Sequence, residues 1–370
     1  MNVNKSVGSF KPLDVSVIIP TYNRARLVVE AIESVLHQTA PPREIIVIDD
    51  GSTDETPRAL ESFGNRIISI HQENQGVGAA RNRGLAMAQG RYLAFLDSDD
   101  IWLEFKLELQ IAVMERIPEI GFLFSDFLIT REGGSVMPRG LQTWYRHPRP
   151  WEQVFEKVTS SVFSVLPGDD QVRIYSGQIY RALLTEPYVL PSCAIVRTDR
   201  LTPDIRFAEG YPNCSDWEFF ARLARTCDAG FLELDTTINR GGNDRPRLTQ
   251  SSAATKADLR LRMIGRVWKS DAAFLAAHGG EVRAVEADQC LDLAWARLLE
   301  SEPVAALAAL QRWFRLGCPD RWRAALILAA CALFPGSGAV LRRVRELLAR
   351  FRAAKPIPHD SNRTGTLGGY

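Results

Sequence analysis

Short, largely apolar runs, the first of them rich in β-branched residues, alternate with segments of helical periodicity through residues 15–96. The runs lie at residues 15–19, 44–48, 67–71 and 92–96. After the first run, apolar residues recur over 27–36 at the three- and four-residue spacing of a helix. Strands that alternate with helices form mainly parallel sheets with helices on both faces. The sequence therefore predicts an α/β fold.

Polar motifs follow the end of each predicted strand. They are the segments at residues 20–23, 49–54, 76–84 and 97–100. The carboxyl ends of parallel strands meet at one edge of a sheet, where α/β proteins bind their ligands. We therefore expect these motifs to surround one binding site.

The last of these motifs is a cluster of acids, Asp97-Ser98-Asp99-Asp100. Neighbouring carboxylates repel each other, and a cation between them removes that repulsion. Oxygen ligands suit Mg²⁺ or Mn²⁺, and an ion held by one or two carboxylates keeps positions open for substrate phosphates. The cluster thus indicates a metal-bound nucleotide. The alternative is a solvated acidic turn at the start of the next helix.

Four segments carry a resemblance over residues 15 to about 128: VSVIIPTYNR, IIVIDDGSTDET, NQGVGAARNRGL and GRYLAFLDSDD. In this order they resemble the inverting glycosyltransferases of family 2. The resemblance implies a GT-A fold and a bacterial enzyme of polysaccharide or lipopolysaccharide synthesis that uses a nucleotide sugar. A dinucleotide-binding motif fits less well, because Arg81 stands at its third glycine position. A nucleotidyltransferase is also disfavoured, because PTYNR replaces the glycine-rich loop of that class.

The resemblance also assigns residues to the donor nucleotide, which we expect to be a UDP-sugar. The residues expected around the base are Pro20, Thr21, Tyr22 and Asn23. Tyr22 offers a flat face for stacking, Asp50 can accept the imide N–H of uracil, and Arg81 adds positive charge near the phosphates. Each also has a structural interpretation, as a turn aromatic, a turn acid and a surface helix charge.

Asp97-x-Asp99 matches the DxD motif of the family. The resemblance implies that Asp97 and Ser98 contact the nucleotide sugar. It also implies that Asp99, together with Asp97, binds the Mn²⁺ or Mg²⁺ that bridges the two phosphates. It assigns no role to Asp100.

A general base is expected at residues 215–218, because an acceptor hydroxyl must lose its proton as it attacks. This segment resembles the family's ED-x-(D/E) helix start, in which the Asp is the base. Asp216 matches that Asp, and Glu218 is the fallback base. Ser215 replaces the usual preceding acid, and we expect this loss to lower the pKa of Asp216. The alternative is a pair of acids that only stabilise a helix N-terminus.

Arg240, Arg245 and Arg247 lie in a segment that resembles the loop closing over the diphosphate. Many relatives have a His there, and this chain has none in the segment. The arginines are therefore expected to neutralise the leaving diphosphate. A solvated arginine loop is the alternative.

The predicted domain organisation has four parts. They are an extension at 1–13, a GT-A domain at 14–250, a helical region at 255–353 and a disordered tail at 354–370. Residues 14–128 form the nucleotide-sugar half of the GT-A domain, and residues 129–250 form the acceptor half. In the acceptor half, Trp144, Tyr145 and Trp151 are interpreted as a sugar-stacking face or as local core.

The C-terminal region is helical and basic. Helical patterns occur at residues 287–300, 303–316, 320–334 and 338–353. Residues 312–363 contain eleven Arg or Lys and three acids, whereas the net charge of the whole chain is +1. Such asymmetry indicates peripheral contact with an anionic membrane surface, or else a packed bundle with a solvated arginine face.

Composition narrows the remaining function classes. Near-neutral overall charge argues against a nucleic-acid partner. The polar N-terminus lacks a signal-peptide pattern, and the six cysteines lack metal-ligand spacing, so a cytoplasmic protein is expected, at most peripheral on the inner face of the plasma membrane. The expected acceptor is a glycan or lipid-linked glycan, and the residues do not specify an oligomeric state. The alternative function is a non-catalytic sugar-nucleotide-binding or scaffold protein.

Overall fold

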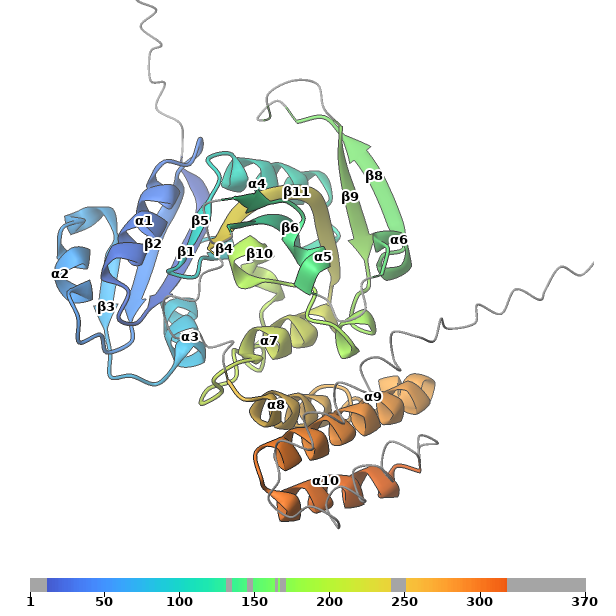
Figure 1. Ribbon diagram of the computed structural model, residues 1–370. Coiled ribbons are helices and arrows are strands. Elements are labelled where there is room, and N and C mark those ends of the chain that lie inside the picture. The colour runs from blue at the N-terminus through green and yellow to red at the C-terminus, as the bar shows by residue number, and fades with distance from the viewer. Residues whose placement is uncertain are drawn as a thin grey trace, which may run out of the picture. The chain divides into compact units, whose positions relative to one another are not determined.

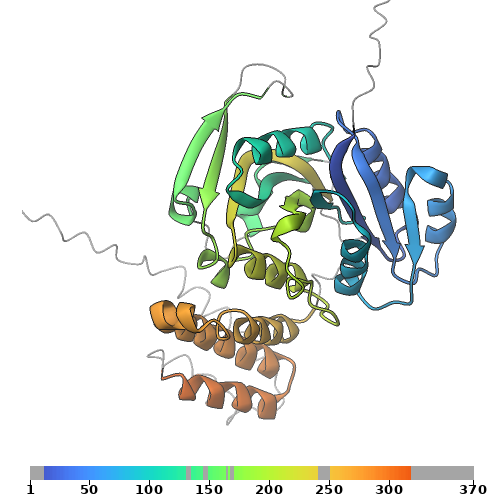
Figure 2. The same cartoon turned by 180° about the vertical axis from the view of Figure 1, so that it is seen from behind.

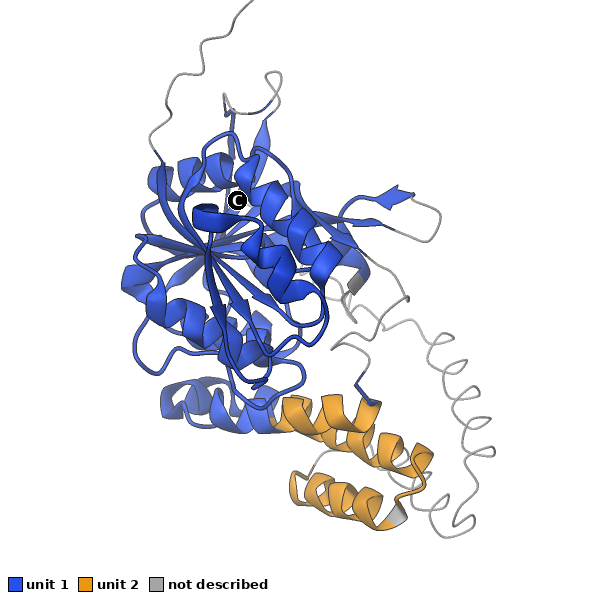
Figure 3. Cartoon of the chain, turned by 90° about the vertical axis from the view of Figure 1, so that its left-hand side faces the viewer, with its two compact units in different colours: residues 1–252, 262–282 blue, residues 253–261, 283–370 orange. Residues whose placement is uncertain are grey.

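The computed structural model describes residues 12–130, 135–144, 149–163, 166, 171–240 and 251–317. The chain divides into two compact units, shown in blue and orange in Figure 3. The first contains residues 1–252 and 262–282, and the second contains 253–261 and 283–370. The domain boundaries given by the sequence remain predictions. Both the predicted disordered tail and the predicted helices at 320–334 and 338–353 lie outside the described residues.

A mixed sheet forms the centre of the first unit (Figure 1). Its order in the described residues is β3-β2-β1-β4-β10-β6-β11-β9-β8, with β5 paired to β11 and β7 to β6. The strands are β1 (Leu13–Thr21), β2 (Pro42–Asp49), β3 (Ile68–His71), β4 (Tyr92–Phe95), β5 (Asp100–Trp102), β6 (Ile120–Thr130), β7 (Val136–Met137), β8 (Lys157–Ser161), β9 (Val172–Gly177), β10 (Ala194–Arg197) and β11 (Asp228–Arg240).

Parallel pairing is confirmed where the strand and helix patterns alternate. Strands β3, β2, β1 and β4 are mutually parallel neighbours. Strand β10 runs antiparallel between β4 and β6, and β6 and β11 are again parallel. The polar segments after β1, β2 and β4 therefore lie at one edge of the sheet.

Helices cover both faces of this sheet (Figures 1 and 2). The helices of the first unit are α1 (Ala25–Leu36), α2 (Thr56–Glu61), α3 (Val77–Met87), α4 (Lys106–Arg116), α5 (Gly140–Trp144), α6 (Trp151–Val154) and α7 (Ser215–Ala224). Short 3₁₀ turns are η1 (Gly64–Arg66), η2 (Ala182–Leu184), η3 (Pro191–Cys193) and η4 (Thr198–Arg200). Val17 of β1 shares an apolar cluster with Ile32 of α1, whereas Ile46 and Ile48 of β2 pack with Ala80 of α3. Burial on both faces explains the continuous apolar runs of these strands.

Three helices follow the sheet: α8 (Ala253–Arg266), α9 (Ala272–Leu299) and α10 (Pro303–Arg315). This confirms a helical C-terminal region. Within the second unit, Leu291 and Leu298 of α9 pack with Leu310 and Trp313 of α10. None of the described helices has the length and apolar character required to cross a membrane.

Candidate donor and catalytic site

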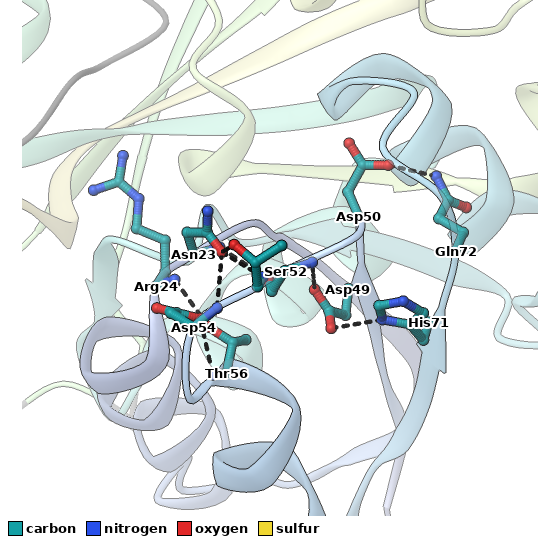
Figure 4. Close-up of polar contacts among 10 residues, drawn as sticks. Asn23, Arg24, Asp49, Asp50, Ser52, Asp54, Thr56, His71 and Gln72 are labelled. Atoms are coloured by element: carbon teal, nitrogen blue, oxygen red, sulfur yellow. Dashed lines mark hydrogen bonds and ion pairs between the residues drawn. The ribbon is translucent and has the colours of Figure 1, made fainter.

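The turns after β1 and β2 are joined through Asn23 (Figure 4). Asn23 has a left-handed backbone with φ 51°, and its N–H donates to Ser52 Oγ at 2.8 Å. Its side-chain oxygen accepts the N–H groups of Thr53 at 2.8 Å and Asp54 at 3.3 Å. Asn is among the few non-glycine residues that adopt this backbone readily. Asn23 therefore sets the relative position of the first two predicted motifs.

The predicted base-contacting residues occupy this same edge. Pro20 and Thr21 end β1, and Thr21 is buried. The side chain that follows, Tyr22, is 46% exposed. An aromatic ring this exposed presents a face on which a base can stack.

Asp50 is buried, and its carboxylate is held by three donors. Oδ1 accepts Gln72 Nε2 at 2.8 Å and the N–H of Gln75 at 3.0 Å, while Oδ2 accepts the N–H of Gly76 at 2.8 Å. These bonds fix the entry to α3. A carboxylate has about four acceptor positions, so the predicted contact with a base N–H is still compatible with this arrangement.

Arg81 is buried and pairs with an acid of the DxD motif. Its Nη2 lies 2.5 Å from Asp97 Oδ1, and its guanidinium lies 5.1 Å from the centre of the Phe207 ring. Phe207 in turn stacks on Phe219 of α7, with the ring centroids 4.1 Å apart. Arg81 is therefore not the surface charge of the alternative interpretation. It connects α3 to the end of β4 and to the segment before α7.

Helix α3 approaches that segment closely because its second residue, Gly78, has no side chain. A Cβ on Gly78 would lie 2.4 Å from the carbonyl oxygen of Ala208. Four residues further on, Asn82 Nδ2 donates to the Phe207 carbonyl at 2.9 Å, and its Oδ1 accepts the Phe207 N–H at 2.9 Å. These contacts determine where Arg81 lies relative to α7.

The four residues of the acid cluster have different surroundings. Asp97 and Asp99 are partly exposed, and Asp99 Oδ2 lies 3.7 Å from Arg24 Nη2. Ser98 is buried. Asp100 is also buried, begins β5 and accepts Asn239 Nδ2 of β11 at 2.9 Å. Asp100, to which the family resemblance assigns no role, therefore contributes to the pairing of β5 with β11.

Asp97 and Asp99 suit a divalent ion whose other ligands come from elsewhere. The described residues contain no group of three His, Cys, Asp or Glu side chains that could hold a metal. Mg²⁺ and Mn²⁺ are commonly bound through one or two carboxylates, with phosphates and water completing the shell. Two partly exposed carboxylates one residue apart fit this arrangement.

Ser192 supports the acid cluster through a contact that the sequence did not predict, although its segment, residues 191–197, resembles the strand that lies beneath the acceptor in the family. Its Oγ accepts the N–H of Asp97 at 3.1 Å. Its carbonyl accepts Trp102 Nε1 at 2.7 Å and Thr237 Oγ1 at 3.0 Å. Ser192 is fully buried in η3. A serine in a Pro-Ser-Cys segment gives no sequence signal for contacts with residues so distant along the chain.

Asp216 lies in the first turn of α7, after Cys214, which has a left-handed backbone with φ 64°. Its Oδ1 accepts the N–H of Trp217 at 2.9 Å. Burial raises the pKa of Asp216; the positive charge of Arg81 opposes this, and the negative charge of Asp97 adds to it. The net direction is opposite to the one expected from the missing acid at Ser215. Burial outweighs that loss, because desolvation disfavours the charged carboxylate.

Glu218, the fallback base, is buried and bound by two arginines. Its Oε1 accepts Arg222 Nη2 at 2.9 Å and Nε at 3.1 Å. Its Oε2 accepts Arg266 Nη2 at 2.7 Å. Both Glu218 oxygens already accept hydrogen bonds from arginines, so Glu218 is placed less well than Asp216 to accept one from an acceptor hydroxyl. This geometry favours Asp216.

The remaining sequence candidates fall in three places. Arg240 ends β11 and pairs with Glu30 of α1. Arg245, Arg247 and Tyr145 lie outside the described residues, as does the side chain of Trp144. Trp151 is buried and stacks on Phe231 with the ring centroids 3.8 Å apart. Trp151 is therefore local core.

The first unit has the GT-A fold, with the candidate site at the carboxyl ends of its parallel strands. A solved structure of Staphylococcus aureus TarS, residues 1–349 in complex with UDP-GlcNAc, resembles this chain with a TM-score of 0.58. The two are 19% identical, and the match covers 92% of this chain and 91% of that chain. At this identity the likeness supports the fold alone.

Residues 16–198 match the family model described as Glycosyl transferase family 2. The chain therefore carries a domain of glycosyl transferase family 2. An uncharacterized glycosyltransferase of Rickettsia felis is 50% identical over 113 residues, which are 30% of this chain and 18% of that protein. The putative teichuronic acid biosynthesis glycosyltransferase TuaG of Bacillus subtilis is 41% identical over 136 residues, 35% of this chain and 53% of TuaG.

A third relative is the Escherichia coli UDP-Glc:alpha-D-GlcNAc-diphosphoundecaprenol beta-1,3-glucosyltransferase WfgD. It is 41% identical over 124 residues, 33% of this chain and 49% of WfgD. This chain thus spans about half of TuaG and WfgD and about a fifth of the Rickettsia protein.

Proposed function

We propose that this protein is an inverting glycosyltransferase that moves a sugar from a UDP-sugar to a hydroxyl of a glycan or lipid-linked glycan. The observation that carries the proposal is the placement of Asp216. This acid lies in α7, whose Phe219 stacks on the Phe207 ring over which the Arg81 guanidinium packs. The charges of Arg81 and Asp97 also act on the pKa of its carboxyl. This arrangement supports the proposal that the candidate base and the candidate donor groups belong to one site.

The proposed chemistry is a single in-line displacement. The Asp216 carboxylate takes the proton of the acceptor hydroxyl while the hydroxyl oxygen attacks the anomeric carbon. The bond to the nucleoside diphosphate breaks on the opposite side, so the anomeric configuration inverts. The raised pKa of Asp216 suits this role, because a general base works best when its pKa approaches the working pH.

Residues at the strand edge would bind the donor. Tyr22 and Asp50 would contact the base, and Arg81 would hold Asp97 in place beside the phosphates. Asp99, with Asp97, would hold Mn²⁺ or Mg²⁺. When bound, the ion would neutralise charge on the departing diphosphate. Arg240, and by the sequence resemblance Arg245 and Arg247, would add positive charge there.

The relatives support the choice of substrates. WfgD is named for a UDP-glucose donor and a diphosphoundecaprenol-linked acceptor, and TarS was solved with UDP-GlcNAc. A lipid-linked acceptor would bring the enzyme to a membrane surface. The basic character of residues 312–363 suits such contact, and we propose a cytoplasmic enzyme peripheral on the inner face of the plasma membrane.

The first experiment is a thermal-shift and hydrolysis screen of UDP-, GDP- and TDP-sugars with Mn²⁺. We expect one donor class to raise the melting temperature, and Asp99→Ala to remove this effect. Asp216→Asn should retain donor stabilisation while turnover falls. If no nucleotide sugar stabilises the wild-type protein, the donor-binding proposal is wrong, and if donors bind but no acceptor panel gives product, the non-catalytic alternative is favoured.

Stereochemistry provides an independent test of the mechanism. With a donor of known anomeric configuration, proton NMR of the product distinguishes inversion from retention. Retention would exclude the single displacement by Asp216.

A further inference from the structure

Each acid of Asp97-x-Asp99 faces its own arginine. Arg81 Nη2 lies 2.5 Å from Asp97 Oδ1, and Arg24 Nη2 lies 3.7 Å from Asp99 Oδ2. Two guanidinium groups thus balance the two carboxylates on which the proposed metal site depends.

The two pairs differ in how firmly the structure holds them. The Arg81 side chain is 5% exposed and packs over the Phe207 ring. The Arg24 and Asp99 side chains are 17% and 24% exposed, and their charged atoms are more than an ångström further apart. An ion pair whose charged atoms lie 3.7 Å apart gains less Coulomb energy than one whose atoms lie 2.5 Å apart. The Arg24–Asp99 contact is therefore the looser of the two, and the one that a ligand of stronger charge can replace more readily.

The backbone of Arg24 is held by a hydrogen bond, whereas its side chain extends away from that contact. The Arg24 N–H donates to Thr56 Oγ1 at 3.0 Å, at the start of α1. In Figure 4 the Arg24 guanidinium extends away from Asp54 and Thr56. A side chain on a fixed backbone can change its partner without moving the turns that surround the donor edge.

Charge determines which partner Arg24 prefers in each state. A divalent ion that arrives alone at Asp99 meets the positive guanidinium, which repels it. A nucleoside diphosphate brings the negative charge that both the ion and the guanidinium require. Guanidinium groups bind phosphate oxygens through paired, charge-assisted hydrogen bonds.

We propose that the Arg24 guanidinium and the metal ion alternate as partners of the Asp99 carboxylate. The guanidinium pairs with Asp99 when no donor is bound. When the ion and the nucleotide bind together, the guanidinium moves to the donor diphosphate. This inference rests on the proposed donor and metal site. It makes metal binding and nucleotide binding strongly coupled, and by linkage each raises the affinity of the other by the same factor.

The test measures Mn²⁺ binding to the full-length protein by the EPR signal of free Mn²⁺, with and without UDP. In the wild type, UDP should increase Mn²⁺ affinity by about tenfold or more. In Arg24→Gln, Mn²⁺ alone should bind about tenfold more tightly, and the enhancement by UDP should shrink by a similar factor. Calorimetry of UDP binding in the presence of Mn²⁺ should show weaker affinity in this variant.

Arg26→Gln is the matched control, because it removes the same charge from a side chain that is 84% exposed and pairs with Glu30. It should leave both affinities near those of the wild type. Arg24→Lys, which keeps the charge but not the paired geometry, should keep weak binding of Mn²⁺ alone and lose UDP affinity. It serves as a second variant if Arg24→Gln does not fold.

The outcomes separate this inference from the proposed function. If Mn²⁺ and UDP bind together but Arg24→Gln has wild-type affinity for Mn²⁺ alone, the exchange is refuted and the donor site stands. The exchange is also refuted if UDP does not change Mn²⁺ affinity in the wild type. If the wild type binds neither ligand in any combination, both proposals are wrong.

Discussion

Replacing Glu218 with Gln tests whether this acid is a structural residue or a base. Glu218 is buried and accepts three hydrogen bonds from Arg222 and Arg266. Glutamine has nearly the same shape but no charge. The substitution therefore leaves two guanidinium groups without their counter-ion, and its amide nitrogen faces at least one of them.

The expected cost follows from the exposure of the two arginines. Breaking a buried ion pair costs about 3–5 kcal/mol. The Arg222 and Arg266 side chains are 27% and 45% exposed, so water compensates part of that loss. We expect Glu218→Gln to lower the free energy of unfolding by about 2 kcal/mol. For a unit of this size, that corresponds to a melting temperature lower by about 4–8 °C.

Differential scanning calorimetry and steady-state kinetics of Glu218→Gln, Arg266→Gln and the double variant provide the assay. The double variant should lose less unfolding free energy than the sum of the two single variants, because both single changes remove the same ion pair. At a temperature where the variants are folded, kcat should stay near the wild-type value. A fall in kcat of about a hundredfold or more, with an unchanged melting temperature, would show that Glu218 acts as the base and that our reasoning is wrong.

Four further predictions concern other residues. Asp216→Asn should lower kcat by about 10²–10⁴-fold; because burial raises the pKa of Asp216, ionisation opposes folding, so calorimetry should find the variant at least as stable as wild type at neutral pH. Burial raises the pKa of Asp126 to about 6, so the stability of the wild type should fall as pH rises from about 4 to about 6. Thermal unfolding measured at several pH values should show that Asp126→Asn flattens this dependence. Gly78→Ala should cost about 1–3 kcal/mol and weaken donor binding in calorimetry, because its Cβ would meet the Ala208 carbonyl; unchanged affinity would contradict the proposed role of α3. Ser192→Ala should cost about 1–2 kcal/mol and raise the KM for the donor more than it lowers kcat, because the Asp97 N–H loses its acceptor; rescue by Thr, but not by Val, would support that role.

Much of the nucleotide half could be predicted from local pattern. The runs at 15–19, 44–48 and 92–96 lie within or along β1, β2 and β4, and the motifs after them meet at one sheet edge. This succeeded because a strand that is buried on both faces must be apolar throughout, whereas its end must be polar. Parallel pairing then brings the ends together without further information.

The roles of individual side chains could be predicted less well, because they depend on which residues from other segments contact them. The sequence places Asp216 and Glu218 two positions apart on one helix, and only the family resemblance favours Asp216 over Glu218 as the base. The fold places Arg222 and Arg266 on Glu218 and leaves Asp216 toward Arg81 and Asp97. Burial also raised the pKa of Asp216, although the neighbouring residue alone predicted the opposite direction.

By itself, the sequence determined the α/β alternation, the strand-end motifs and the helical C-terminal region. Tertiary structure alone decided the supports of the site. The Asp97 N–H donates a hydrogen bond to Ser192, which is 95 residues away in the sequence, and Asn82 donates one to the Phe207 carbonyl, 125 residues away. Periodicity reports only which face of an element is buried, over one or two turns. A contact between distant segments exists only once the sheet order and the close approach of helices have been established, so no local pattern encodes it.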